Sequence, residues 1–284
     1  MLEPKVIYDF GANNGDDLPY YLLKADKVVA VEANPTLCRQ IEARFEAEIK
    51  AGRLVVENCV LAEGQTNRQV PFYVHKTNDV LSQFPRPEDD KIGNYECISL
   101  ASESPLSLTE RHGAPYYIKV DVEHYDAEIL RLIFEAGLRP PFISAESHDV
   151  EVFAVLVALG GYKAFKLVDG RSVGDRFIDH PIRSSNGEGT YSFPHHSAGP
   201  FGEDIPGGWM AADNFFRLLA LEGLGWKDIH ATNQVAPDPE LLPSVKAYFV
   251  KAMADRMPGR ARKLARSAVA KAFPEVTRVA AKAR

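Results

Sequence analysis

Three observations predict an open α/β fold, in which helices cover both faces of a mostly parallel sheet. Short β-rich runs alternate with amphipathic, helix-length segments over the first two-thirds of the 284-residue chain, the pattern of such a sheet. The first β-rich run ends in a turn that contains two glycines, and the second run ends in an acidic residue. In an open α/β sheet, ligands bind outside the carboxyl ends of the strands. The sequence therefore places its ligand site at this edge.

The predicted strands and helices alternate along the chain. Strands are expected at Lys5–Phe10, Lys27–Glu32, Arg53–Val60, Tyr116–Asp121, Phe142–Glu146 and Tyr162–Val168. Helices are expected near Leu18–Lys24, Pro35–Ala51, Tyr125–Ala136 and Val150–Leu159. Pro35 suits a first helical position because its missing N–H group would have no partner there. Gly52 and Gly137 lie where helices tend to end.

The chain divides into three parts by composition. Residues 1–168 carry the alternating pattern, interrupted between Val70 and Gly113 by a predicted β-rich insertion with a Pro- and Asp-rich loop. Residues 169–243 are dense in Gly, Pro and Ser but keep scattered aromatics, which favours a structured C-terminal cap that shapes a substrate pocket. Residues 244–284 are rich in Ala, Lys and Arg and are predicted to form a basic helical or disordered tail.

Composition excludes several classes of protein. The net charge is −6 although the tail is basic, so the body is strongly acidic and lacks the basic face of a nucleic-acid binder. No signal peptide is recognisable, and no apolar run approaches the ~20 residues of a membrane span. The three cysteines fit neither a disulfide framework nor a zinc pattern. We therefore expect a cytoplasmic protein with no nucleic-acid partner and no membrane span, whose basic tail suits at most a membrane surface.

The strongest local signal is the turn after the first predicted strand. Asp9 ends this strand, and the chain turns through Gly11 and Gly15, where backbone approaches a ligand without a Cβ in the way. Glu32 ends the second strand, where an acid accepts both hydroxyls of a ribose. Together they predict an adenosine-containing cofactor. The acids that follow the turn disfavour a pyrophosphate and suit a cationic sulfonium, as in S-adenosylmethionine.

Four segments resemble the FkbM-type S-adenosylmethionine-dependent methyltransferase family, over residues 6–168. They are Asp9-Phe10-Gly11-Ala12-Asn13-Asn14-Gly15, Val31-Glu32-Ala33-Asn34-Pro35, Tyr117-Ile118-Lys119-Val120-Asp121-Val122-Glu123 and Phe142-Ile143-Ser144-Ala145-Glu146-Ser147-His148. The resemblance implies a seven-stranded methyltransferase sheet in residues 1–168 and O-methylation, often of sugars or natural-product hydroxyls. The family usually continues its Asp-Val-Glu with Gly, a small residue and Glu, whereas this chain has His124, Tyr125 and Asp126.

The resemblance and the turn together give a set of expected cofactor contacts. By analogy with the family, Asn58 and Cys59 flank the adenine at the end of the third strand. The complete predicted set is Asp9, Gly11, Asn13, Asn14, Gly15, Glu32, Ala33, Asn58, Cys59 and Asp121.

The predicted catalytic residues follow the fourth and fifth strands. No Asn/Asp-Pro-Pro-aromatic motif, typical of amine methyltransferases, follows the fourth strand, so oxygen is the preferred acceptor. A histidine is the natural base for a hydroxyl proton near neutral pH. We therefore expect His148 or His124 to be the base, with Asp121 orienting the base or the substrate.

Alternatives remain open for this site and for the whole chain. We assign no metal ligand, but the side chains at the same strand ends offer donors for a divalent ion as an alternative. The rival functions are a nicotinamide-dependent oxidoreductase and a non-catalytic, nucleoside-binding scaffold. The expected partner is a small-molecule or carbohydrate acceptor, and the sequence leaves its identity and the oligomeric state open.

Overall fold

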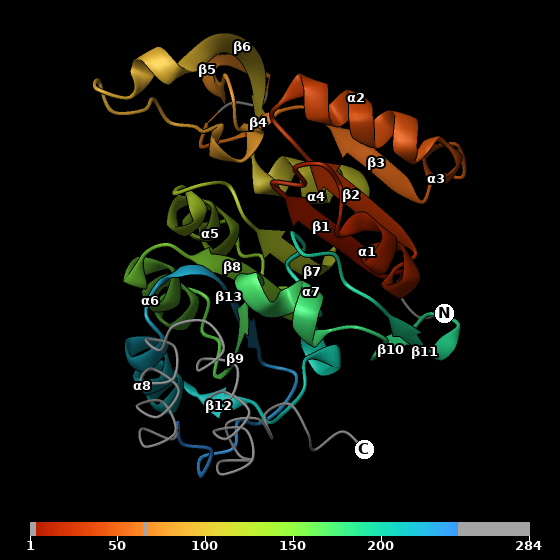
Figure 1. Cartoon of the computed structure of the whole chain (residues 1–284), viewed down its shortest axis with the longest axis vertical. Coiled ribbons are helices and arrows are strands. Elements are labelled where there is room, and N and C mark those ends of the chain that lie inside the picture. The colour runs from red at the N-terminus through yellow and green to blue at the C-terminus, as the bar shows by residue number, and fades with distance from the viewer. Residues whose placement is uncertain (1–3, 65–66, 244–284) are drawn as a thin grey trace, which may run out of the picture.

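Eight strands form the central sheet in the computed structural model, which describes residues 4–64 and 67–243 (Figure 1). From one edge to the other they are β12 (Met210–Ala211), β9 (Ala164–Asp169), β13 (Gly225–Thr232), β8 (Phe142–Ser147), β7 (Pro115–Val120), β1 (Val6–Phe10), β2 (Lys27–Val31) and β3 (Leu54–Glu57). All neighbours from β8 to β3 are parallel. β13 runs antiparallel to both β8 and β9. The predicted mostly parallel sheet is confirmed, and the two-residue β12 adds an edge strand to it.

Helices cover both faces of the sheet, as predicted. One face packs against α4 (Pro105–His112), α5 (Asp126–Glu135), α6 (Val150–Ala158) and α8 (Ala212–Glu222), and the other against α1 (Leu18–Lys24), α2 (Pro35–Arg44), α3 (Glu46–Lys50) and α7 (Val173–Arg176). Side chains alternate between these layers along each strand. In β1, Tyr8 and Phe10 pack in the first layer and Ile7 in the second. Burial on both faces explains why β1 is apolar except at Asp9.

Local chemistry sets the ends of α2. Asn34 precedes it and its Oδ1 accepts a hydrogen bond from the backbone N–H of Thr36 at 3.0 Å, which satisfies one of the unpaired donors of the first turn. Pro35 occupies the first turn, as predicted. The predicted helix over residues 35–51 is divided in two at Phe45, whose backbone leaves helical geometry while its ring is buried in the core.

The predicted β-rich insertion forms a separate small sheet. It consists of β4 (Val60–Leu61), β6 (Tyr95–Glu103) and β5 (Arg68–His75), with β5 and β6 paired antiparallel. Two 3₁₀ turns, η1 (Asp79–Leu81) and η2 (Ile92–Asn94), lie in the connection between β5 and β6. In Figure 1 this small sheet lies at the end of the molecule that carries α2, opposite α8 and β12. The insertion therefore stands beside the carboxyl ends of β1 and β2.

The segment after β9 contributes more than loops. β13 inserts between β8 and β9, a pairing that the sequence analysis did not include because residues 225–232 lie in the stretch assigned to a cap. The same segment holds η3 (Gly170–Ser172), η4 (Gly202–Asp204) and the hairpin of β10 (His180–Ser184) and β11 (Gly187–Tyr191). Within the described residues, no helix is long and apolar enough to cross a bilayer. The predicted tail, residues 244–284, lies outside the described residues.

Candidate active site

A cavity of about 550 Å³ opens at the point where the strand order reverses. β1 is flanked by β2 on one side and by β7 on the other, so the loops that follow β1 and β7 leave the sheet in different directions. Ligands in open α/β sheets bind at such a point. The walls come from the turn after β1, the ends of β2 and β8, the loop after β7, the insertion and two residues beyond β9, His196 and Trp226. The volume lies within the range of small-molecule sites.

Gly11 is required because two strand ends approach each other closely. Its φ is +85°, and a Cβ atom on it would lie 1.8 Å from the backbone oxygen of Asp121. The backbone N–H groups of Gly11 and Ala12 both donate to the oxygen of Val31, at 2.9 and 3.0 Å. The turn is thereby bound to β2 and packed on the loop after β7. Any side chain at position 11 would separate β1 from β7.

The other residues of the turn have different surroundings. Asn13 and Asn14 line the cavity, and Asn13 has a positive φ of 47°. Gly15, with φ of +78°, is not among the lining residues, and a Cβ on it would meet Leu18 and Ile41 instead. The close packing of Leu18 and Ile41 under the turn explains why this position is a glycine.

Glu32 lines the cavity with both carboxylate oxygens already oriented by backbone. Its Oε2 accepts from the N–H of Asn13 at 2.8 Å and its Oε1 from the N–H of Asn34 at 2.7 Å. Burial raises the pKa of Glu32 to about 7, against the lowering effect of these two hydrogen bonds. Each oxygen of a carboxylate has a second lone pair. The side chain is therefore fixed in place and still able to accept two more hydrogen bonds.

Residues around the end of β3 complete this side of the site. Asn58 Nδ2 donates to the backbone oxygens of Glu32 and Ala33, both at 2.9 Å, but Asn58 is not among the lining residues. Ala33 and Cys59 line the cavity, and burial raises the pKa of the Cys59 thiol. Asn58 thus holds the backbone that Ala33 and Cys59 present to a ligand.

Lys119 lies buried beneath the cavity among three carboxylates. Its Nζ is 3.2 Å from Asp121 Oδ2, 3.4 Å from Asp9 Oδ1 and 3.6 Å from Asp17 Oδ2. Burial opposes its charge, but the three acids together raise the pKa of Lys119. Asp9, predicted to contact the cofactor, is fully buried and is not among the lining residues. The sequence analysis did not single out Lys119 as a site residue, although a lysine inside a strand that is otherwise apolar was the signal for it.

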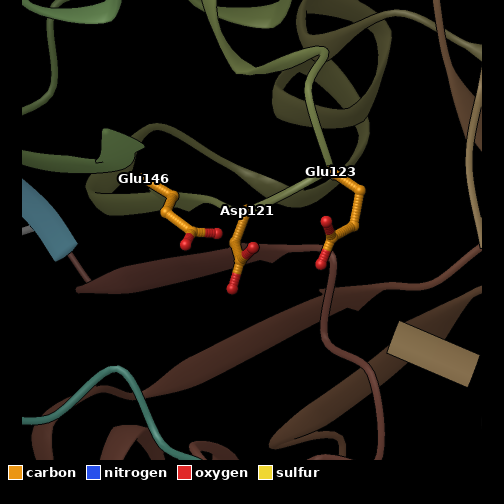
Figure 2. A group of neighbouring side chains, drawn as sticks. All are labelled: Asp121, Glu123 and Glu146. Carbon is orange, nitrogen blue, oxygen red and sulfur yellow. The ribbon is translucent and has the colours of Figure 1, made fainter. Parts of the chain in front are cut away.

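Three acids gather on the β7–β8 side of the cavity, and we call Asp121, Glu123 and Glu146 the acidic cluster. One carboxylate oxygen from each lies within 4.8 Å of the others, and Figure 2 shows the three carboxylates turned toward a shared space with Asp121 between the two glutamates. Burial, and then repulsion by Asp121, raise the pKa of Glu123 to about 7 and of Glu146 to about 8.

The backbone that carries Glu123 is unusual. Glu123 and His124 both have positive φ, at 47° and 66°, a conformation that non-glycine residues adopt only when the surrounding structure imposes it. His124 is the first position at which the chain departs from the family pattern, which has a glycine after the glutamate. The chain adopts this left-handed geometry with a histidine at that position.

Both predicted bases lie beside the acidic cluster, but neither is among the lining residues. His148 Nε2 is 2.9 Å from Glu146 Oε2 and 3.8 Å from Glu123 Oε2. The His124 ring lies 4.4 Å from the His148 ring, centroid to centroid, and burial followed by the His148 charge lowers the pKa of His124. Carboxylates, in particular that of Glu146, therefore lie between the histidines and the cavity. The sequence analysis did not assign this position to Glu146.

The charge of the lining is one-sided. Its carboxylates outnumber its amines: Lys119 is the lysine among the described lining residues, against Asp16, Asp17, Glu32, Asp79, Asp121, Glu123 and Glu146. Apolar side chains from the insertion, Phe72, Val80, Leu81 and Phe84, face the same space. Such a cavity favours a ligand with positive charge and an apolar or aromatic part.

Comparison with known proteins finds similarity in structure alone. No family model and no curated protein matches the sequence. The chain is similar to the methyltransferase FkbM from Methylobacillus flagellatus KT, at 15% identity and a TM-score of 0.37, over 58% of this chain and 40% of that one. It is also similar to precorrin 8w decarboxylase from Methanobacterium thermoautotrophicum, at 12% identity and a TM-score of 0.36 over 81% and 82% of the chains.

A third similar structure is an O-methyltransferase from Bacillus cereus in complex with SAH, at 9% identity and a TM-score of 0.35 over 81% and 74% of the chains. This chain spans less than half the length of the FkbM protein. Similarity at this level leaves the function to be argued from the site.

Proposed function

We propose that this protein is an S-adenosylmethionine-dependent methyltransferase that acts on a hydroxyl group of a sugar, glycoconjugate or natural product. The observation that carries the proposal is the acid-lined cavity at the switch point of the sheet, with Glu32 held by two backbone N–H groups. The hydroxyl as acceptor comes from the family resemblance and from the missing amine-methyltransferase motif.

The residues present fit this cofactor. Gly11 lets the turn pack against the backbone of Asp121, where a Cβ would clash, and Glu32 offers two oriented oxygens to a ribose. Ala33 and Cys59, beside the apolar Val60 and Leu61, provide apolar surroundings for an adenine. The acidic lining complements a sulfonium and an ammonium group. When bound, the cofactor supplies an electrophilic methyl group.

The chain's own residues then position the acceptor and accept its proton. In-line placement of the hydroxyl oxygen against the methyl carbon lowers the barrier by roughly 7–11 kcal/mol in favourable cases. The oxygen–carbon bond forms as the carbon–sulfur bond breaks, and sulfur takes the electron pair. The hydroxyl proton goes to the ionised form of Glu146, which lines the cavity, and because burial raises the pKa of Glu146 to about 8, this step is favoured at alkaline pH. His148 Nε2 lies 2.9 Å from Glu146 Oε2, without an aligned hydrogen bond between them. Asp121 orients the acceptor, and His124 supports the His148 ring.

The nicotinamide-dependent alternative fits this site less well. A dinucleotide-binding sheet has six parallel strands in the order 3-2-1-4-5-6, whereas here the antiparallel β13 separates β8 from β9. A pyrophosphate would also meet Asp16 and Asp17, which line the cavity next to the glycine turn. Both observations favour a cationic nucleoside over an anionic dinucleotide.

Calorimetry with S-adenosylhomocysteine tests the cofactor. We expect the wild-type protein to bind it and Glu32→Ala to weaken binding by about 1.5–3 kcal/mol, the scale of a charge-assisted hydrogen bond that is lost. Glu57→Ala is the matched control, because Glu57 ends the neighbouring strand β3 and is not among the lining residues. Absence of binding by the wild type, or equal binding by Glu32→Ala, would contradict the proposal, as would tight binding of reduced nicotinamide dinucleotide.

Transfer of a labelled methyl group from the cofactor identifies the acceptor. Incubation of the protein with methyl-labelled S-adenosylmethionine and a cell extract, followed by mass spectrometry, should reveal a product with a methyl ether. Label on an amine or a carbon atom instead would contradict the hydroxyl as acceptor and leave the cofactor unaffected. Turnover with His148→Ala then tests the proton route, for which a base typically contributes about 10²–10⁴-fold.

A further inference from the structure

Trp226 is a partly exposed aromatic residue that lines the cavity from the C-terminal segment. It is 39% exposed, whereas the other tryptophan of the chain, Trp209, is 6% exposed. Burial of the apolar face of an indole against a ligand is strongly favourable. Trp226 lies beyond residue 168, where the family resemblance ends, and the proposed proton route does not use it. Its exposure inside a cavity of ligand size therefore needs its own explanation.

The backbone of β13 is irregular at this residue. The register against β8 shifts between Gly225 and Asp228, which pair with adjacent residues of β8, so Trp226 and Lys227 form a bulge. Bulges redirect side chains and are common beside active sites. Lys227 Nζ donates to the backbone oxygens of the last residue of α8 and of the residue after it, both at 3.0 Å. The bulge is thus anchored to α8 while Trp226 lies in the cavity.

Two glycines leave room for the aromatic rings of this segment. A Cβ on Gly170 would lie 2.4 Å from Trp226 Nε1, so the indole packs directly on the backbone after β9. A Cβ on Gly174 would lie 2.5 Å from Nδ1 of His195, the residue before His196. The rings of His196 and Trp226 are nearly parallel, with 12° between their planes and 6.1 Å between their centroids. The cavity is therefore lined by two parallel rings, which we call the ring pair.

The loop that carries His196 is anchored to the start of α1. The backbone N–H of Ala198 donates to the two carboxylate oxygens of Asp17, at 3.0 and 3.3 Å. Phe193 packs against Tyr20 of α1, with ring centroids 4.8 Å apart. Because α1 follows the glycine turn, these contacts fix the ring pair relative to that turn.

The ring pair lies on the side of the cavity that is far from Glu32. From β13 the sheet continues through β8, β7 and β1 to β2. Neighbouring strands are about 4.8 Å apart, so β13 and β2 are roughly 19 Å apart. Trp226 is therefore distant from the strand that ends at Glu32, and it lies beside β8, which carries Glu146. A ligand ring on the indole would lie next to the proposed proton acceptor and away from the ribose site.

We propose that Trp226, with His196 beside it, binds the acceptor by stacking on the flat face of a ring that carries the reacting hydroxyl group at its edge. This identification of the acceptor rests on the proposed methyltransferase function. A sugar presents C–H groups on its ring face and hydroxyl groups around its edge, and a phenol presents a π face and an edge hydroxyl. An open-chain alcohol has no such face. Trp226 thus selects cyclic acceptors.

Methyl transfer by variants tests this role in binding. With the acceptor from the cell extract, Trp226→Ala should raise KM by about 10–100-fold and leave kcat nearly unchanged, because the stacking contact is made equally in the bound and the reacting states. Trp226→Phe keeps an aromatic face and should restore most of the affinity. An unchanged KM for Trp226→Ala would overturn the proposal.

Phe216→Ala is the matched control for that substitution. Phe216 is 50% exposed, and its ring is nearly parallel to that of Phe153, with 17° between planes and 6.0 Å between centroids. It lies on α8 and is not among the lining residues. This variant should keep the wild-type KM. A rise in KM as large as that of Trp226→Ala would show a general effect of losing a surface ring and overturn the role of Trp226.

Fluorescence tests the same contact without methyl transfer. In Trp209→Phe the remaining tryptophan is Trp226, which acrylamide quenches because it is exposed. If this variant does not fold, the wild type serves, because its Trp209 is buried. We expect methyl α-glucopyranoside or catechol to protect Trp226 from acrylamide, and open-chain glucitol not to. Protection by the glucoside identifies a sugar ring, and protection by catechol an aromatic one. Equal protection by glucitol, or none by any of the three compounds, overturns the proposal.

Calorimetry with S-adenosylhomocysteine separates this inference from the proposed function. A Trp226→Ala protein that binds the nucleoside like the wild type is folded, so its raised KM supports the ring pair as the acceptor site. A wild type that binds the nucleoside while no ring compound protects Trp226 overturns the ring pair and leaves the methyltransferase proposal standing. Protection of Trp226 in a protein that binds no nucleoside supports the ring pair and overturns the function.

Discussion

The carboxylates on the two sides of the cavity have opposite surroundings. On the β1–β2 side, Glu32 receives a hydrogen bond on each oxygen from the backbone N–H groups of Asn13 and Asn34. On the β7–β8 side, Asp121, Glu123 and Glu146 face one another and repel. The first side is complete without a ligand and still has lone pairs for neutral hydroxyl groups. On the second side, Lys119 is shared with Asp9 and Asp17, and His148 is the ion-pair partner of both glutamates, so these groups compensate the three acids only in part.

The difference follows from the elements that carry each side. A tight turn supplies backbone donors at fixed positions, so a single acid after β2 is oriented by the main chain. The ends of β7 and β8 bring the side chains of two strands together. Lys119 lies under both sides and contacts Asp9 and Asp17 as well as Asp121. It is the residue through which the two sides share charge.

Removal of this lysine should have the largest effect because both sides lose their shared cation. Lys119→Met leaves Asp9, Asp17 and Asp121 without compensation, and breaking a buried ion pair in this way lowers the free energy of unfolding by about 3–5 kcal/mol. Urea denaturation followed by circular dichroism measures it. Lys163→Met, at an exposed lysine, is the control and should change stability by less than about 0.5 kcal/mol. Equal midpoints for the two variants would remove Lys119 from its structural role.

A substitution at Gly11 tests whether both sides of the cavity depend on the close approach of β1 to β7. A Cβ at this position would lie 1.8 Å from the oxygen of Asp121, so Gly11→Ala should push β1 and β7 apart and reduce stability by about 1–3 kcal/mol through overpacking. The affinity for the nucleoside should also fall. Gly52→Ala is matched for backbone strain, with φ of +70° but no atom within 4 Å of its Cβ. If the two alanine variants behave alike, strain and not contact explains the glycine.

The sequence predicted one side of the cavity far better than the other, and the reason is local. The turn, Glu32 and helix α2 depend on residues close together in the chain, so the glycine spacing and the start of the helix at Pro35 were readable from it. The acidic cluster joins β7 to β8, and its geometry depends on the left-handed backbone of Glu123 and His124, which no propensity indicates.

Pairings over long distances in the sequence were the other limit. β13 is separated from β8 by 77 residues between their bounds Ser147 and Gly225, across a segment rich in Gly, Pro and Ser, and its residues Asp228 and His230 interrupt an apolar pattern. The insertion was predicted as β-rich, but only the folded chain shows that Asp79 to Phe84 face the cavity. Likewise, His148 was readable as a strand-end histidine, but its position behind Glu146 depends on packing.

The smallest expected effect concerns pH and separates the two sides without a large structural change. Burial raises the pKa of Glu32 to about 7, and its ionised form is the better acceptor for ribose hydroxyls. Affinity for S-adenosylhomocysteine should therefore rise between pH 6 and pH 8, by about tenfold for a site with a pKa of about 7 that binds only in its ionised form. Glu32→Gln should bind weakly and lose this part of the pH dependence.

Stability of the free protein should move in the opposite direction for the same residue. Because the folded state holds the Glu32 proton more tightly than the unfolded state, with a pKa near 7 against 4.5, its contribution to stability is present below pH 4.5 and is lost as pH rises to 7. A comparison of wild type with Glu32→Gln isolates this trend from the other raised acids. Rising affinity with falling intrinsic stability is the pattern of a carboxylate held ready for a ligand. If both instead rise together with pH, the β1–β2 side is not the preorganised one, and the contrast between the two sides fails.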